Sequence, residues 1–98
     1  MDEVVYDKLV VNQLEKLCYV DDEPIALNRK EYLTLLFLMS NPNRIFTRRE
    51  ISENVWGVAR SSRTIDTVIN KIRHKIKEYK KNLVTRAGFG YGFFNKPL

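Results

Sequence analysis

Residues 62–79 read SRTIDTVINKIRHKIKEY, and the apolar residues of this stretch recur at the spacing of an α-helix. Its four isoleucines stand four, three and four positions apart: Ile65, Ile69, Ile72 and Ile76. Side chains at these intervals share one helical face, so the isoleucines predict a buried stripe. The opposite face carries polar and basic residues and is the one that a partner can reach.

Another helix is predicted upstream, between Asn28 and the stop sequence Asn41-Pro42-Asn43. Asn28 and Glu31 have the spacing of a capping box, in which each side chain accepts a hydrogen bond from the other's backbone N–H. Residues 32–39 are apolar on nearly every side of such a helix, which predicts that it is buried in the core.

A short helix is predicted between these two. Thr47 and Glu50 form a second capping-box pattern, and the helix is expected to end near Trp56-Gly57. Together with the helix at 62–79 it makes a helix-turn-helix-like unit. The second helix of that unit can enter the major groove of duplex DNA, since both are about 12 Å wide.

Short strands are predicted on both sides of the helices. Before them, residues 4–6, 9–11, 17–20 and 25–27 are rich in β-branched and aromatic residues and alternate with polar breaks, which favours an antiparallel meander. After them, residues 83–86 and 89–94 indicate a hairpin. Its alternating glycines do not form a nucleotide-binding loop, because no helix can follow in the six residues left after Gly92. The expected fold class is α+β.

The net charge of +5 is distributed unevenly along the 98 residues. Residues 1–43 hold four basic and eight acidic side chains, a net of −4, whereas residues 44–98 hold thirteen and four, a net of +9. A basic field confined to one part of a domain is typical of proteins that attract nucleic-acid phosphates.

The composition excludes several other classes. One cysteine, Cys18, cannot form an internal disulfide or a cysteine-rich zinc site, and it is expected to be a strand residue. One histidine, His74, cannot build a multi-histidine metal site. No paired carboxylates or activated nucleophile can be assembled, so an enzyme is not expected and no cofactor is implied. No signal peptide or membrane span is visible, which predicts a cytoplasmic protein.

The exposed face of the helix at 62–79 supplies candidate DNA contacts. Lysine can bond guanine, asparagine can bond adenine, and threonine can use its hydroxyl or methyl group. The candidates for reading base edges are Thr67, Asn70, Lys71 and His74. Arg63 and Thr64 lie in the first turn, where free backbone N–H groups also favour phosphate. Arg73 and Lys75 lie further round and are candidates for the DNA backbone.

In order and spacing, these segments resemble the OmpR/PhoB-type winged-helix DNA-binding domain, the effector domain of many bacterial response regulators. The resemblance covers nearly the whole chain. It rests on Leu27-Asn28, Lys30-Glu31-Tyr32, Leu35-Leu36, Arg44-Ile45-Phe46-Thr47-Arg48, Val55-Trp56-Gly57, Arg63-Thr64-Ile65-Asp66, Ile69, Lys71-Ile72-Arg73, Lys75-Ile76 and Gly88-Phe89-Gly90-Tyr91-Gly92-Phe93.

The resemblance implies one winged-helix domain over residues 1–98, with an N-terminal four-stranded sheet (1–27), a three-helix unit (28–80) and a wing hairpin (83–94). It implies sequence-specific binding of double-stranded DNA for transcriptional regulation, with the recognition helix at about 62–79 in the major groove. Trp56 and Tyr91 match positions that are mainly structural in the family.

Further partners are also implied by the resemblance. The loop between the second and third helices matches a segment that meets RNA polymerase in relatives: Val58, Ala59, Arg60 and Ser61. Relatives often bind direct-repeat DNA as homodimers. A receiver domain is expected N-terminal to this domain, and no receiver-type sequence is present among these residues.

The wing departs from the family pattern. Relatives usually carry Thr-Val-Arg-Gly, with the Arg reaching the minor groove, whereas this chain has Thr85-Arg86-Ala87-Gly88. Gly92 also replaces a commonly basic residue. Thr85 and Arg86 therefore remain candidates for the DNA backbone, while Ala87 and Gly92 leave open whether this wing contacts the minor groove.

One other interpretation stays open from the residues alone. A winged-helix interaction module could use the same basic face to bind an acidic protein or RNA. Binding to random duplex DNA at low salt separates the two interpretations, because a DNA-binding domain retains non-specific affinity for duplex DNA under those conditions.

Overall fold

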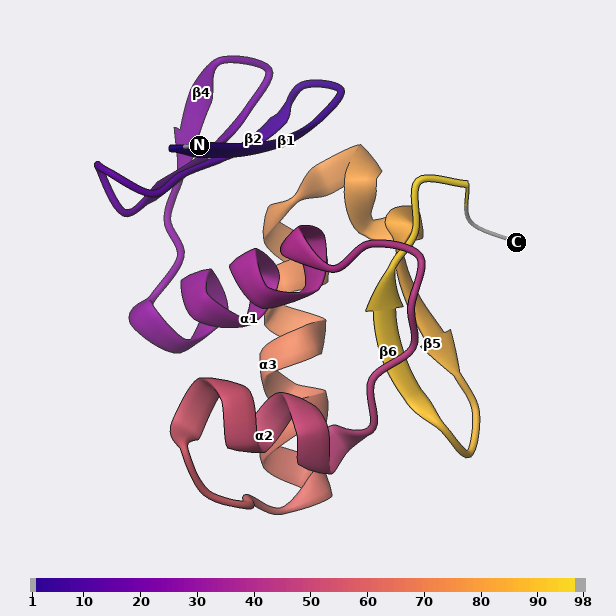
Figure 1. Ribbon diagram of the computed structural model, residues 1–98. Coiled ribbons are helices and arrows are strands. Elements are labelled where there is room, and N and C mark those ends of the chain that lie inside the picture. The colour runs from indigo at the N-terminus through magenta and orange to yellow at the C-terminus, as the bar shows by residue number, and fades with distance from the viewer. Residues whose placement is uncertain (1, 97–98) are drawn as a thin grey trace.

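The computed structural model describes residues 2–96, so Met1, Pro97 and Leu98 of the predicted domain lie outside the described residues. Four strands come first: β1 (Glu3–Tyr6), β2 (Leu9–Asn12), β3 (Leu17–Val20) and β4 (Glu23–Ile25). Three helices follow, α1 (Arg29–Ser40), α2 (Arg48–Trp56) and α3 (Ser62–Lys75), and then a short 3-10 helix, η1 (Lys77–Asn82). A hairpin of β5 (Leu83–Arg86) and β6 (Gly90–Phe93) closes the order, which confirms the predicted α+β winged-helix fold (Figure 1).

The N-terminal strands form an antiparallel sheet in the order β1-β2-β3-β4, and this sheet lies over α1 (Figure 1). Its inner face buries Leu9, Val11, Cys18 and Val20. Burial raises the pKa of the Cys18 thiol to about 12, so this cysteine is an inert core residue of a strand, as predicted.

The fourth strand lies two residues earlier than predicted, at Glu23–Ile25 instead of 25–27. Asp21 and Asp22 have φ angles of 51° and 68°, so these two residues alone make the hairpin turn. Pairing then resumes at once, with Glu23 opposite Val20. Pro24 is tolerated because β4 is an edge strand, where a missing N–H breaks no ladder bond.

The capping boxes predicted for α1 and α2 are both present. The Asn28 side chain accepts from the Glu31 N–H at 2.9 Å, and Glu31 accepts from the Asn28 N–H at 3.0 Å. The prediction that α1 is buried on nearly every side was wrong in part. Leu33, Leu36 and Phe37 are only half-buried, because α2, α3 and the sheet do not enclose the outer side of this helix.

The third helix ends earlier than the predicted 79. Its backbone hydrogen bonds stop at Ile76, and Lys77 has a φ of 56°, which no α-helix accommodates. The chain turns there into η1, where Tyr79 is buried. The Tyr79 hydroxyl donates to Asp7 at 3.1 Å and accepts from the Lys8 N–H at 3.1 Å. This link to the β1–β2 turn is a long-range contact that helical periodicity does not reveal.

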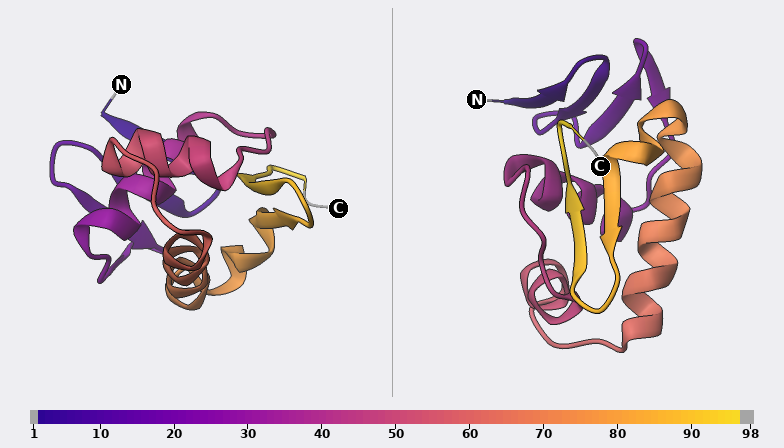
Figure 2. Two further views of the ribbon diagram at one scale, coloured as in Figure 1. Left: turned by 90° about the horizontal axis from the view of Figure 1, so that it is seen from below. Right: turned by 90° about the vertical axis from the view of Figure 1, so that its right-hand side faces the viewer.

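The hairpin stands beside α3 and is attached to the rest of the fold along both of its strands (Figure 2). Tyr91 of β6 exchanges two backbone hydrogen bonds with Phe46, at 2.8 and 3.0 Å. A Cβ at Gly90 would lie 1.9 Å from the Phe46 carbonyl oxygen, and one at Gly92 would lie 2.1 Å from that of Arg44. The absence of a side chain at these two positions is what allows β6 to approach the segment before α2.

Candidate nucleic-acid interface

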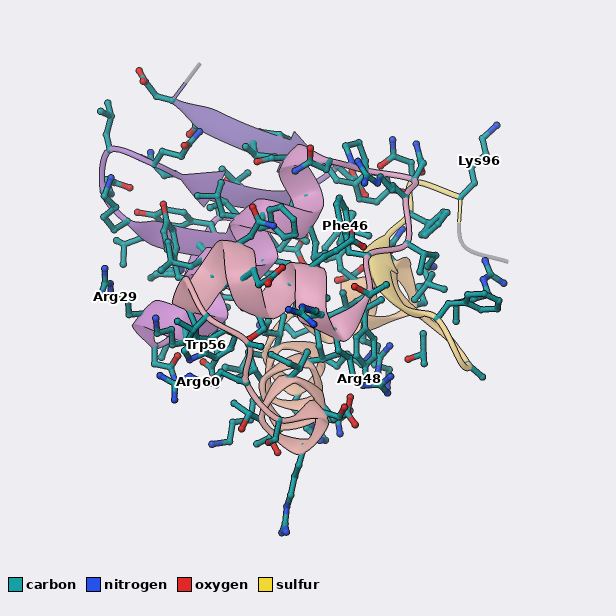
Figure 3. All side chains as sticks on the ribbon, turned by 60° about the horizontal axis from the view of Figure 1, so that its bottom comes forward. Arg29, Phe46, Arg48, Trp56, Arg60 and Lys96 are labelled. Carbon is teal, nitrogen blue, oxygen red and sulfur yellow. The ribbon has the colours of Figure 1, made fainter. Side chains whose placement is uncertain are left out.

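The exposed side of α3 projects away from the core. The buried residues of α3 are Ile65, Ile69 and Ile72, the first three members of the predicted isoleucine stripe. Arg63, Thr67, Asn70, Lys71 and His74 are exposed on the other side. Figure 3 views α3 nearly end-on and shows side chains spreading outward from it on the side away from α1. A continuous polar ridge therefore faces solvent.

Three of the four candidate base readers are free of intramolecular bonds. Within residues 2–96 no hydrogen bond or ion pair engages the side chains of Asn70, Lys71 or His74. The hydroxyl of Thr67 donates to the Arg63 carbonyl oxygen at 2.8 Å, which leaves its methyl group for a base contact.

The first turn of α3 has a different arrangement. The Ser61 hydroxyl caps the helix by accepting from the Thr64 N–H at 3.2 Å, and the Ser61 and Thr64 hydroxyls are 3.0 Å apart. Thr64 is therefore part of the cap and only half-exposed. Arg63 is exposed beside it, at the positive end of the helix dipole, where an anion is favoured.

Arg73, predicted as a contact to the DNA backbone, bonds to the wing in this structure. Its Nε and Nη2 donate to the Leu83 carbonyl oxygen at 3.0 and 2.6 Å, and Nη2 also donates to the Thr85 hydroxyl at 2.6 Å. Burial lowers the pKa of Arg73, and the group is half-buried. Arg73 thus ties α3 to β5, and Thr85 is one of its acceptors.

Lys75 is also engaged inside the fold. Its ammonium lies 2.6 Å from Oε1 of Glu31, a carboxylate that is 1% exposed at the start of α1. A buried carboxylate needs such a partner, because an unpaired charge in the core costs several kcal/mol. This pairing connects the C-terminal end of α3 to the N-terminal end of α1.

Asp66 is the acidic residue of α3. Its carboxylate forms an ion pair with one neighbour and accepts a hydrogen bond from another. Arg48 of α2 donates to its Oδ1 from 2.7 Å, and the Tyr91 hydroxyl donates to the same oxygen. Hydrogen bonds from Arg48 and Tyr91 hold the pKa of Asp66 below its ordinary value. The cluster links α2, α3 and β6, so Tyr91 has a structural role here, as its match to the family implied.

Two cations that sequence reasoning did not nominate lie at the C-terminal end of α3. Lys77 and Lys80 line a shallow depression of about 460 Å³ together with Asn70, Arg73, His74 and Glu78. The run of lysines after residue 76 was the available signal, but a helix predicted to continue to 79 gave no indication that Lys77 and Lys80 lie together. The bend at Lys77 brings them to the end of the α3 ridge.

A buried serine of α2, Ser52, anchors the loop between α2 and α3. The Ser52 hydroxyl donates to the Val58 carbonyl oxygen at 2.7 Å and accepts from the Arg60 N–H at 2.6 Å. Val58, Ala59, Arg60 and Ser61 are all exposed on the outside of this loop. Arg86, in the wing, is exposed as well.

A family model described as "Transcriptional regulatory protein, C terminal" matches residues 22–93, from the β3–β4 turn to the end of the wing. The chain belongs to this family of OmpR/PhoB-type DNA-binding domains. The transcriptional regulatory protein VxrB of Vibrio cholerae is 36% identical to the chain over 90 residues, which cover 90% of the chain and 36% of VxrB.

Solved structures of the family share the fold. The response regulator DrrB of Thermotoga maritima, an OmpR/PhoB homologue, superposes with a TM-score of 0.85 at 29% identity and covers 95% of the chain. The C-terminal effector domain of BfmR from Acinetobacter baumannii has a TM-score of 0.80 at 30% identity and covers 99% of the chain. The chain spans 44% of DrrB but 95% of the BfmR effector domain, so it corresponds to the effector part of the longer regulators.

Within residues 2–96 no helix is long and apolar enough to cross a membrane, and no group of three or more His, Cys, Asp or Glu side chains could hold a metal ion.

Proposed function

We propose that this effector domain binds a specific sequence of double-stranded DNA, with α3 in the major groove. The observation that carries the proposal is the exposed side of α3, where Asn70, Lys71 and His74 are free of partners within the described residues. Side chains already bonded inside the fold would have to break those bonds before they could reach a base. These three need no such rearrangement.

The proposal divides the basic residues into two groups. Arg63 at the start of α3, Lys77 and Lys80 at its end, and Arg86 in the wing are exposed and act on the phosphate backbone. Arg73 and Lys75 act indirectly, because their charged groups hold the wing and α1 in place. Thr64 keeps its capping bonds to Ser61. The Thr85 hydroxyl accepts from Arg73, so its own O–H stays available to donate to a phosphate oxygen.

The role of the domain in the cell is inferred from the family to which it belongs. We propose that the domain regulates transcription in the cytoplasm as the effector of a response regulator, under the control of a receiver domain. Val58 to Ser61 are the proposed contact to RNA polymerase, since this loop is anchored by Ser52 and displays its side chains outward. Two copies would occupy direct-repeat DNA. The proposal assigns binding and no catalytic step, and it treats residues 1–98 as one domain.

The test is selection of bound sequences from a random pool of duplex DNA. The expected result is one enriched half-site, repeated in direct orientation if the protein binds as a homodimer. Titration of the selected duplex and of a scrambled duplex then measures specificity. No enrichment, together with no binding to random duplex at micromolar protein and low salt, would reassign the basic face to an acidic protein or to RNA.

A further inference from the structure

A shallow depression at the end of α3 holds the one histidine of the chain, His74. The depression measures about 460 Å³ and is lined by Asn70, Arg73, His74, Lys77, Glu78 and Lys80. The imidazole of His74 is exposed and has no hydrogen-bond or ion-pair partner within residues 2–96. Histidine is the residue type whose charge ordinarily changes between pH 5 and 8, so the lining includes a group that can gain a charge when a ligand arrives.

The lining of the depression suits an anion. Three of its residues are cations: Arg73, Lys77 and Lys80. Glu78 is its one acid, so three positive charges and one negative charge give a net charge of +2 before His74 is counted. A phosphate group in the depression would therefore enter a positive field.

The neighbouring elements add no charged side chain to this lining. The charged residues that they bring to α3 and η1 are Asp7 and Lys8 of the β1–β2 turn, Glu31 of α1 with its partner Lys75, Arg48 of α2 with its partner Asp66, and Arg86 at the end of β5 away from η1. Lys71 of α3 and Lys81 of η1 are exposed outside the lining, and both are cations. The charges that face His74 are therefore those of the lining itself.

DNA on the exposed side of α3 would reach this depression. Asn70 belongs both to the exposed ridge of α3 and to the lining, one turn before His74. A duplex that contacts Asn70 and Lys71 thus brings its backbone towards the end of the helix, where Lys77 and Lys80 are exposed.

A phosphate distinguishes the two forms of the imidazole ring. Its charged oxygens accept hydrogen bonds, and the protonated ring has two N–H donors and a positive charge, whereas the neutral ring has one donor. Glu78 and the C-terminal end of α3 act on His74 in the free and in the bound protein alike. The phosphate is present only in the complex, so the protonated form is more favoured there than in the free protein.

We propose that this depression binds one phosphate of the DNA backbone and that His74 takes up a proton from solvent as the phosphate binds. The complex then holds more protons than the free protein and DNA, so affinity rises as the pH falls. The inference rests on the proposed binding of α3 to DNA. It moves His74 from the bases to a phosphate beside the bases that Asn70 and Lys71 would read.

The experiment measures binding of the wild-type domain to the selected duplex at pH 6, 7 and 8 and constant ionic strength. Affinity is expected to fall about five-fold from pH 6 to pH 8, because uptake of one proton limits the change to about ten-fold per pH unit. The slope of log K against log salt should be steeper at pH 6 than at pH 8 by up to about 0.9, since the protonated ring adds one phosphate contact. Calorimetry in two buffers with different heats of ionisation counts the proton directly.

Two substitutions at position 74 separate charge from shape. His74→Asn cannot be protonated and is expected to bind at every pH as the wild type does at pH 8. His74→Lys carries a fixed charge, so its affinity should be independent of pH in this range and higher at pH 8 than that of His74→Asn. Asn70→Ala is the matched control, because it alters the same ridge without a titrating group and should keep the pH dependence of the wild type.

A second arm tests whether the ligand is a phosphate. Single phosphates of the selected duplex are replaced in turn by uncharged methylphosphonates. One position is expected to abolish the pH dependence of the wild-type protein. A scrambled duplex should show the same pH dependence as the selected one, because its phosphates are the same.

The outcomes separate the inference from the function beneath it. Equal wild-type affinity at pH 6 and pH 8, or a pH dependence that persists in His74→Asn, would show that His74 takes up no proton. A pH dependence confined to the selected duplex and unaffected by every methylphosphonate would place His74 on a base and overturn the phosphate site. Failure of the wild-type protein to bind any duplex at any of these pH values would refute the proposed function itself. Since His74 is exposed, the unfolding temperatures of its variants should match the wild type and exclude misfolding as the cause.

Discussion

At the scale of single residues, the structure separates basic side chains that are free from those that are already bonded. The side chains of Lys71 and Arg63 are exposed, and neither has a hydrogen-bond or ion-pair partner within the described part of the chain. Arg73 and Lys75 lie on the same helix but bond to Leu83 and Glu31. The sequence assigned Lys71 to bases and the other three to the DNA backbone, but it did not separate Arg63 from Arg73 and Lys75. Their different contacts predict different consequences of substitution.

Lys71→Ala is expected to weaken binding to the selected duplex by about 1–3 kcal/mol and to relax the preference at one base pair, because a base contact discriminates between sequences. Binding titrations on the selected duplex and its single-pair variants measure this. Lys16→Ala, in the β2–β3 turn, removes the same charge away from α3 and η1 and is the control. Equal losses on selected and scrambled DNA would move Lys71 to the phosphate backbone.

Arg63→Ala is expected to weaken all duplexes alike and to make the slope of log K against log salt shallower by about 0.9, since one phosphate contact is lost. The measurement is the salt dependence on selected and scrambled duplexes. A loss confined to the selected duplex would show that Arg63 reads a base.

At the scale of elements, side-chain bonds join α3 to its neighbours. Arg48, Asp66 and Tyr91 connect α2, α3 and β6, and Arg73 connects α3 to β5. These bonds orient the wing and α2 around the recognition helix. The two bonds to Asp66 join residues that are 18 or more positions apart in the sequence. The pattern within any one element therefore does not reveal them.

Arg73→Ala is expected to lower the free energy of unfolding by about 1–3 kcal/mol, because the Leu83 carbonyl oxygen loses a charged donor. Denaturant unfolding measures the loss. Arg73→Lys should recover little, since an ammonium cannot reproduce the paired donation from Nε and Nη2. Unchanged stability with weaker DNA binding would instead make Arg73 a direct phosphate contact.

Acid should weaken the Asp66 cluster. The pKa of Asp66 is lower in the folded than in the unfolded protein, so its contribution to stability is complete above the unfolded pKa of about 4 and is lost as the pH falls towards the folded pKa. Asp66→Asn is expected to reduce the decline of unfolding free energy between about pH 5 and pH 3. An identical decline in the wild type and the variant would contradict this assignment.

At the scale of the whole molecule, the charge separation in the sequence becomes a separation in space. The net −4 of residues 1–43 belongs to the sheet and α1, and the net +9 of residues 44–98 belongs to α2, α3, η1 and the wing. The acidic sheet lies at the end of the molecule opposite the first turn of α3 (Figure 1). DNA can therefore approach α3 without meeting the acidic sheet.

This arrangement predicts a steep salt dependence. Four exposed cations assigned to phosphate (Arg63, Lys77, Lys80 and Arg86) give an expected slope of log K against log salt of about −3 to −4 for one domain. Lys77→Ala and Lys80→Ala should each reduce it by about 0.9, and the Lys16→Ala control should leave it unchanged. A slope near zero would contradict binding through phosphates.

Local sequence signals were sufficient to predict the elements and their order. Capping boxes, isoleucine spacing and β-branched runs are local signals, because each depends on residues a few positions apart. They predicted the three helices, the sheet, the wing and the exposed face of α3. The bounds of two elements were wrong. Strand β4 begins earlier because Asp21 and Asp22 alone make the turn before it, and α3 ends earlier because Lys77 has a positive φ angle.

Which candidate side chains are already bonded inside the fold becomes visible only in the tertiary structure. Arg73 and Lys75 were predicted as backbone contacts from their helical position, but a carbonyl oxygen 10 residues away and a buried carboxylate 44 residues away bind their charges. The fold likewise brings Lys77 and Lys80 together at the end of α3 and leaves Phe89 exposed in the loop between β5 and β6. Buried polar groups must be paired by whichever charge the fold brings near, and the spacing of residues along one helix carries no information about that partner.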